Sequence, residues 1–189
     1  MKRLFAYAAI LAFVPGTALA ADPSPIGDWR VKEGYANIRI DNCSGKLWGI
    51  VAWEKKPGGL DTENPDLAKK GRPTLGIPVL MGLAQKGPNK WQGEIYNSQN
   101  GKMYSANVSL ADENTLDLEG CLFTDFLCLT QKWTRVKTPP TNAAPLPPIK
   151  GAPQTKQAAA RKGPTTAVSD VCLRVVDEAA AQEKAAAKK

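Results

Sequence analysis

The feature that most constrains the fold is a series of short apolar runs separated by turn residues between positions 26 and 136. Residues 36–41 alternate between apolar and polar side chains, and a period of two is typical of a half-buried β-strand. Eight strand-like segments are expected, at residues 26–30, 36–40, 47–53, 79–84, 91–97, 103–110, 115–120 and 127–136. No helical period separates them. The pattern therefore predicts an all-β domain, most economically an eight-stranded antiparallel up-and-down β-barrel or a clam-like sheet.

The dipeptide Asn100-Gly101 is the clearest turn signal in the chain. It separates the apolar runs 91–97 and 103–110, and it suits the two positive-φ positions of a type I′ turn. These two runs are therefore predicted to form a hairpin.

The longest connection runs from Lys55 to Pro78 and is rich in Pro, Gly, Asp and Asn. Loops of this length are uncommon in compact domains unless they serve a function, so this loop is the first candidate for a site. Lys69, Lys70 and Arg72 form a local positive patch within it. Arg72 is predicted to bind an anionic group of a ligand at the mouth of the barrel. The alternative is an arginine that fixes the loop to the barrel rim.

The same loop contains four oxygen-bearing side chains within six residues, those of Asp61, Glu63, Asn64 and Asp66. Calcium loops use such groups, but the spacing lacks the ligand ladder and the distal glutamate of an EF-hand. Asp and Asn beside Pro commonly start turns. We therefore expect no metal site and no cofactor.

Four aromatic residues on neighbouring predicted strands, Trp53, Trp91, Tyr96 and Tyr104, have two interpretations. They line a small apolar cavity, as eight-stranded barrels commonly allow, or they fill a dry core. The hypothesis carried forward is non-covalent binding of a small apolar or amphiphilic molecule by these four residues and Arg72. The second hypothesis is an envelope interaction or structural protein with a solid barrel.

The first twenty residues have the pattern of a secretory signal peptide. Lys2 and Arg3 precede an apolar run from Leu4 to Val14, and Ala18-Leu19-Ala20 provides a cleavage site. The apolar run is too short to span a membrane as a helix. The protein is therefore expected to be periplasmic or secreted, and not an integral membrane protein.

The sequence contains no histidine, which removes the most common general base and zinc ligand. It also contains no nucleophile elbow, phosphate-binding loop or catalytic triad pattern. We therefore expect a protein that is not an enzyme.

Four cysteines in an exported protein indicate disulfides. Cys121 and Cys128 flank a short turn and are predicted to close the end of a hairpin. Cys43 and Cys172 then either pair with each other or stay free.

The chain changes character after the last predicted strand. Residues 22–136 carry 14 basic and 14 acidic side chains, whereas residues 137–189 carry 9 and 4. Residues 137–165 are predicted to be a Pro/Ala/Lys-rich flexible linker. A basic tail of this kind is expected to dock on anionic lipid or polymer of the envelope under the second hypothesis. The neutral barrel and the predicted export argue against nucleic acid as a partner.

Residues 166–189 are predicted to contain an amphipathic helix, capped by Ser169. Its apolar face would consist of Val168, Val171, Cys172, Val175, Val176 and Ala179. The sequence does not identify a partner for this face. A marginal helix that frays in solvent is the alternative.

Several short motifs occur in a fixed order along residues 24–136, with a Gly-x-Trp start and a Trp-Thr-Arg end. They are residues 26–29, 47–53, 64–66, 72–76, 93–96, 101–104, 120–122 and 133–135. In this combination the chain resembles the bacterial exported family called domain of unknown function 2147. The resemblance implies a lipocalin-like barrel for residues 22–136, and no known activity.

The resemblance also implies the roles of two further residues. In lipocalin-like barrels a tryptophan near the first strand packs against an arginine from the last strand and closes the base. Trp29 and Arg135 match these positions and would meet through a cation–π contact. Many members of the family carry a cysteine at the place of Trp48, which would let Cys43 bridge its own hairpin, but that partner is absent here.

Overall fold

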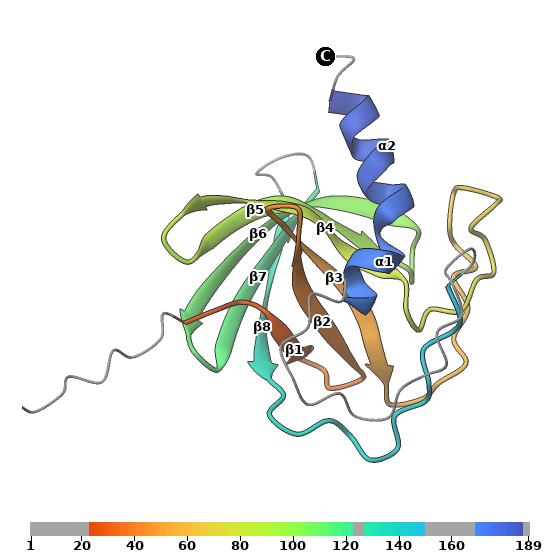
Figure 1. Cartoon of the computed structure of the whole chain (residues 1–189), viewed down its shortest axis with the longest axis horizontal. Coiled ribbons are helices and arrows are strands. Elements are labelled where there is room, and N and C mark those ends of the chain that lie inside the picture. Colours follow the sequence, from red (N-terminus) through yellow and green to blue (C-terminus); the bar gives the residue numbers. More distant parts are fainter. Residues whose placement is uncertain (1–22, 123–126, 150–168, 187–189) are drawn as a thin grey trace, which may run out of the picture.

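The protein is described by a computed structural model that covers residues 23–122, 127–149 and 169–186. Eight antiparallel strands form a closed barrel in which each strand pairs with the next and β1 pairs with β8 (Figure 1). The strands are β1 Gly27–Arg30, β2 Ala36–Cys43, β3 Lys46–Glu54, β4 Pro78–Gly87, β5 Lys90–Asn97, β6 Lys102–Asp112, β7 Thr115–Cys121 and β8 Cys128–Arg135. The predicted up-and-down barrel is confirmed, and the clam-like sheet is excluded.

The hairpin of β5 and β6 forms around Asn100-Gly101, but the predicted turn type is wrong. The last paired residues are Asn97 and Lys102, so four residues rather than two make the loop. Of the dipeptide, only Gly101 has a positive φ, at 68°. A type I′ turn requires positive φ at both central residues, whereas longer hairpin loops do not.

One end of the barrel is closed by Trp29 and Arg135. The guanidinium carbon of Arg135 lies 4.2 Å from the centroid of the fully buried Trp29 ring. The Trp29 indole donates a hydrogen bond to the carbonyl of Pro25 at 2.8 Å, and Arg135 donates to the carbonyl of Ile26 at 2.8 Å. Arg135 also donates to the carbonyl of Ser24. These bonds fasten the segment before β1 across the base of the barrel.

Two helices lie against the outside of the barrel, α1 Asp170–Arg174 over β2 and β3, and α2 Val176–Ala186 beside β4 (Figure 1). Val171 and Val175 are fully buried beneath them, whereas Val176 is 58% exposed. The side chain of Ser169 accepts a hydrogen bond from the backbone N–H of Cys172 and caps α1. The outer wall of the barrel is therefore what covers the apolar side chains of the predicted C-terminal helix.

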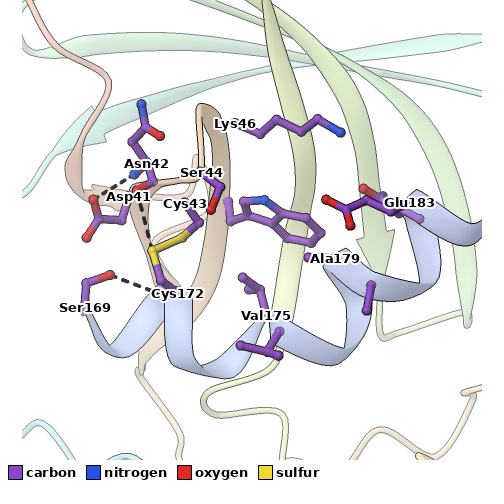
Figure 2. A pocket seen from close by; sticks show the side chains of 14 residues that line it. Asp41, Asn42, Cys43, Ser44, Lys46, Ser169, Cys172, Val175, Ala179 and Glu183 are labelled. Atoms are coloured by element: carbon purple, nitrogen blue, oxygen red, sulfur yellow. Dashed lines mark hydrogen bonds between the residues drawn. A yellow bond between two sulfur atoms is a disulfide. The ribbon is translucent and has the colours of Figure 1, made fainter. Parts of the chain in front are cut away.

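Both disulfides are formed between cysteines of the described residues. Cys121 pairs with Cys128 across the ends of β7 and β8. Cys43 pairs with Cys172 and joins β2 to α1, as Figure 2 shows. The alternative of free thiols at Cys43 and Cys172 is thereby excluded.

The described part of the predicted linker, residues 137–149, contributes to the packed structure. Asn142 accepts a hydrogen bond from the Trp53 indole at 3.3 Å, and Ala144 and Leu146 pack against the core. Arg174 of α1 donates a hydrogen bond to the carbonyl of Pro147 at 2.5 Å. This segment connects the outer wall of the barrel to the helices.

The residues of the predicted signal peptide and residues 150–165 of the linker lie outside the described part of the chain. Among the residues that the structure describes, no helix has the length and apolar character needed to cross a membrane.

The Cys43–Cys172 bond is expected to hold the helices on the barrel. In a Cys43→Ser/Cys172→Ser variant we expect the docking of α1 and α2 to weaken by about 2–4 kcal/mol, the usual contribution of a native disulfide. Amide hydrogen exchange measured by mass spectrometry should then rise in residues 170–186. The strands should keep their protection because the barrel closes on itself without the helices. Unchanged exchange in the helices would contradict this role of the bond.

Candidate functional site

A cavity of about 690 Å³ lies within the barrel. It reaches the solvent at the end formed by the β1–β2 turn, the start of the β3–β4 loop and the β5–β6 turn, whose residues Tyr35, Lys55, Lys56 and 97–100 line it. The volume falls within the range of small-molecule sites, which is about 300–1,000 Å³. The opposite end is occupied by Trp29. The barrel is therefore hollow at one end and packed at the other.

The wall of the cavity is mainly apolar because alternate residues of the strands point inward. The apolar lining includes Ile38, Val51, Val79, Ile95, Leu118 and Trp133. Besides the tyrosines and the rim residues Lys55, Lys56 and 97–100, the polar side chains of the lining are those of Glu54, Thr74 and Gln131. Thr74 donates a hydrogen bond to Oε1 of Glu54 at 2.5 Å and fixes that carboxylate near the rim.

Two of the five predicted ligand-binding residues, Tyr96 and Tyr104, line this cavity. Tyr104 accepts a hydrogen bond from the amide of Asn100 at 2.8 Å. Tyr96 is buried, and its hydroxyl donates to Oδ1 of Asp61 at 2.6 Å. Both tyrosines therefore contribute to the cavity, with their hydroxyl groups held by loop residues.

Trp53 does not line the cavity, which corrects the prediction. Asn37 pairs with Trp53 while the next residue of β2, Ile38, pairs with Val51, so Ala52 is an extra residue in β3. A β-bulge of this kind changes which face the following side chain takes. The Trp53 ring instead lies 4.4 Å from the guanidinium carbon of Arg30 and contacts the segment that follows β8.

Trp91 is also absent from the cavity lining, contrary to the prediction that it contacts a ligand there. It lies near the start of β5, pairs with Val108 of β6, and packs against the core as a half-buried side chain. This is the core interpretation that the sequence left open.

Arg72 does not face the mouth of the cavity as an anion receptor. Its Nε lies 3.2 Å from Oδ2 of Asp61, which is 0% exposed, and its Nη1 lies 3.4 Å from Oε1 of Glu178 in α2. Lys69 binds the same Glu178 oxygen at 3.1 Å. Arg72 therefore joins the loop to α2 through Glu178 rather than directly to the barrel rim, and its loop partner Asp61 accepts a hydrogen bond from Tyr96 of β5.

Asp61 is the centre of this loop network. Besides Arg72 it accepts hydrogen bonds from Tyr96 and from the Asn64 amide at 2.7 Å. Burial raises the pKa of Tyr96 above its ordinary value of 10.0, and the hydrogen bond to Asp61 raises it further. The Asp66 carboxylate accepts from the backbone N–H of Ala68, as turn-forming aspartates do. The hydrogen bonds of Asp61, Asn64 and Asp66 thus stabilise the fold of the loop itself.

Another hollow, of about 700 Å³, lies outside the barrel between the β2–β3 turn and the helices (Figure 2). Trp48, Val175 and Ala179 line it, and Lys46 and Glu183 are among its polar residues. The disulfide between Cys43 and Cys172 borders it. It is the space between the helices and the barrel, and its wall includes the contacts that dock α1.

Sequence reasoning missed Gln131, Glu54 and the two rim lysines, Lys55 and Lys56. The signal for Gln131 was present, because Leu129, Gln131 and Trp133 have the same parity on β8 and all three line the cavity. The prediction considered aromatic residues as the cavity wall and did not consider a polar residue within an inward-facing row.

The closed barrel and its one-ended cavity define a calyx-like protein of the lipocalin type of fold. Residues 27–135 match a family described as an uncharacterized protein conserved in bacteria, DUF2147, and the chain belongs to this family. No curated protein matches it.

A solved structure supports the same fold. It is protein HP1028 from Helicobacter pylori, described as belonging to the lipocalin family, with 19% sequence identity and a TM-score of 0.56. The similarity covers 60% of this chain and 83% of that chain. At this identity the comparison concerns the fold.

Arg72 is expected to matter for stability. Arg72→Met would leave the Asp61 carboxylate buried without its cation, and we expect a loss of about 2–3 kcal/mol in the free energy of unfolding, since Arg72 itself is partly exposed. Urea denaturation measures the change. Lys70→Met is the matched control, because Lys70 is an exposed lysine of the same loop. Equal effects of the two substitutions would contradict the role of Arg72.

Tyr96 is expected to make stability depend on alkaline pH. The pKa of Tyr96 is raised in the folded state, so its hydroxyl ionises at lower pH in the unfolded chain than in the folded protein. Its contribution to the free energy of unfolding is therefore complete below about pH 10 and is lost as the pH rises further. In Tyr96→Phe this part of the pH dependence should disappear. Urea unfolding between pH 8 and 11 provides the comparison, and parallel profiles for the two proteins would refute the assignment.

Proposed function

We propose that the protein binds a small apolar or amphiphilic molecule in the barrel cavity without catalysing a reaction. The observation that carries this proposal is a cavity of about 690 Å³ with a mainly apolar wall and an opening to solvent. Apolar surface that a ligand covers is removed from water, and this supplies the driving force for binding. A few polar groups then fix the orientation.

The rim favours an orientation for an amphiphilic ligand. Lys55 and Lys56 are exposed and line the opening, whereas Ile38, Val51 and Leu118 line the interior. The apolar body of the ligand would enter the barrel, and a polar or anionic end would remain near the lysines. The rim lysines thus take the role that the sequence had suggested for Arg72.

A location in an oxidising compartment agrees with this proposal. Both disulfides of the described residues join separate elements of the fold, and such bonds persist in the periplasm or outside the cell. The predicted signal peptide would provide export. The ligand would therefore come from the envelope or the surroundings.

The second function, docking of a basic tail on an anionic surface, has no support in the described part of the tail. Helices α1 and α2 carry the acidic residues Asp170, Asp177, Glu178 and Glu183 against the basic residues Arg174 and Lys184. Most of the basic tail residues lie outside the described part. Docking through the tail stays a prediction about those residues.

Gly120 provides a direct test of binding in the cavity. It lines the cavity, and a Cβ at this position would lie 3.6 Å from Cγ2 of Ile95 and 4.0 Å from Cβ of Tyr104, which are ordinary contacts. Gly120→Leu should therefore fill part of the cavity without disturbing β7. We expect the affinity for the fluorescent probe N-phenyl-1-naphthylamine to fall about tenfold or more, by loss of the space for the probe.

Thr130→Leu is the control, because Thr130 is an exposed residue of the neighbouring strand. It should leave the affinity for the probe unchanged. Circular dichroism and thermal unfolding of each variant establish that the barrel remains folded. Equal binding of the probe by Gly120→Leu and the unchanged protein would place the probe elsewhere and overturn the proposal.

A further inference from the structure

One polar side chain of the cavity wall, that of Gln131, is held in a fixed orientation by a neighbouring residue. The indole Nε1 of Trp133 donates a hydrogen bond to Oε1 of Gln131 at 3.0 Å. An indole N–H is a donor only, so the atom that it meets must be the amide oxygen. The other atom of the amide, the Nε2 group with its two hydrogens, is consequently directed away from Trp133.

This NH₂ group is available to a ligand. Gln131 lines the cavity and is half-buried. None of the described residues accepts a hydrogen bond from its Nε2, and Nε2 is not enclosed by protein atoms there, in contrast to the buried unpaired Nδ2 of Asn37. Gln131 pairs with Leu118 of β7, another lining residue, so the donor lies within an apolar section of the wall.

We infer that the buried part of the ligand carries an uncharged hydrogen-bond acceptor, the carbonyl oxygen of an amide, ester or ketone, that binds Nε2 of Gln131. This inference rests on the proposed function and names the ligand class for the same cavity. Trp133 is a positioning residue, because its indole holds the amide in the orientation that presents the donor.

The charged side chains of the lining favour an uncharged acceptor at this depth, because Glu54, Lys55 and Lys56 all lie at the rim end of β3 or directly after it. Lys55 and Lys56, the lysines of its lining, belong to the residues that follow β3 at the rim, whereas Gln131 lies in the middle of β8. A carboxylate or phosphate buried beside a neutral amide would lose its hydration without gaining a cation. The anionic end of an amphiphile therefore belongs at the rim, and a carbonyl belongs beside Gln131.

The donor also discriminates against ligands without an acceptor. An alkane that displaces water from Gln131 leaves its NH₂ group unpaired, whereas a carbonyl replaces the lost hydrogen bond. The difference between a paired and an unpaired buried group corresponds to roughly fivefold to hundredfold in affinity.

Nonan-2-one and nonane, which differ by one carbonyl oxygen, test the inference. Their affinities for the full chain are measured by displacement of N-phenyl-1-naphthylamine, and the ratio of the two affinities is compared between variants. Gln131→Met removes the donor and keeps the length of the side chain, so the ratio should shift against the ketone by about fivefold or more. Thr130→Val, an exposed neighbour on β8, should leave the ratio unchanged.

Trp133→Phe tests the positioning role. It removes the hydrogen bond that orients Gln131 and keeps the donor, so the ratio should shift in the same direction as in Gln131→Met but by less. Gln131→Leu replaces Gln131→Met if the latter does not fold, because an aliphatic side chain likewise has no hydrogen-bond donor. It should shift the ratio as Gln131→Met does.

The outcomes separate this inference from the proposed function. If both nonan-2-one and nonane displace the probe but the ratio of their affinities is the same in all variants, binding in the cavity stands and the role of Gln131 is wrong. If the probe does not bind the unchanged protein, or if Gly120→Leu leaves its binding intact, the proposed function fails and this inference fails with it. A shift confined to the Gln131 and Trp133 variants supports both.

Discussion

The pairing of β1 with β8 is the constraint on which the rest of the structure depends. The seam is short, with Trp29 opposite Arg135 and Arg30 opposite Thr134. The contact of the Arg135 guanidinium with the Trp29 ring, together with its bonds to backbone carbonyls, strengthens this seam. Closure removes both sheet edges and gives every strand an inner and an outer face. Without it the apolar inner row would be an open, aggregation-prone surface and there would be no cavity.

The long β3–β4 loop is tied to both faces of this barrel. Asp61 reaches Tyr96, which lines the cavity, and Arg72 reaches Glu178 of α2 on the outside. A buried carboxylate requires such partners because its desolvation is otherwise very costly. The polarity that made the loop resemble a ligand site thus has a structural role, and the polar groups available to a ligand, Gln131 and the rim lysines, lie elsewhere on the cavity wall.

Prediction from the sequence succeeded for the strands and for the β5–β6 hairpin, apart from its turn type, and failed where the outcome depends on register or on distant segments. The eight strands follow from period-two alternation, and the hairpin around Gly101 follows from turn chemistry. The side that Trp53 faces does not follow, because Ala52 forms a bulge that depends on how β2 aligns with β3. The same limit applies to Arg72, since its partner Glu178 lies 106 residues away along the chain.

The sequence by itself determined the all-β class, the strand order and the membership of the family, because short-range alternation, turn residues and ordered motifs are written in neighbouring positions. Only the tertiary structure decided that the barrel is hollow at one end, that Cys43 pairs with Cys172, and that the helices pack on the wall. These features depend on how side chains from distant segments fill a common space. The orientation of Gln131 is decided in the same way, since the fold places the indole of Trp133 and the empty part of the barrel on either side of its amide.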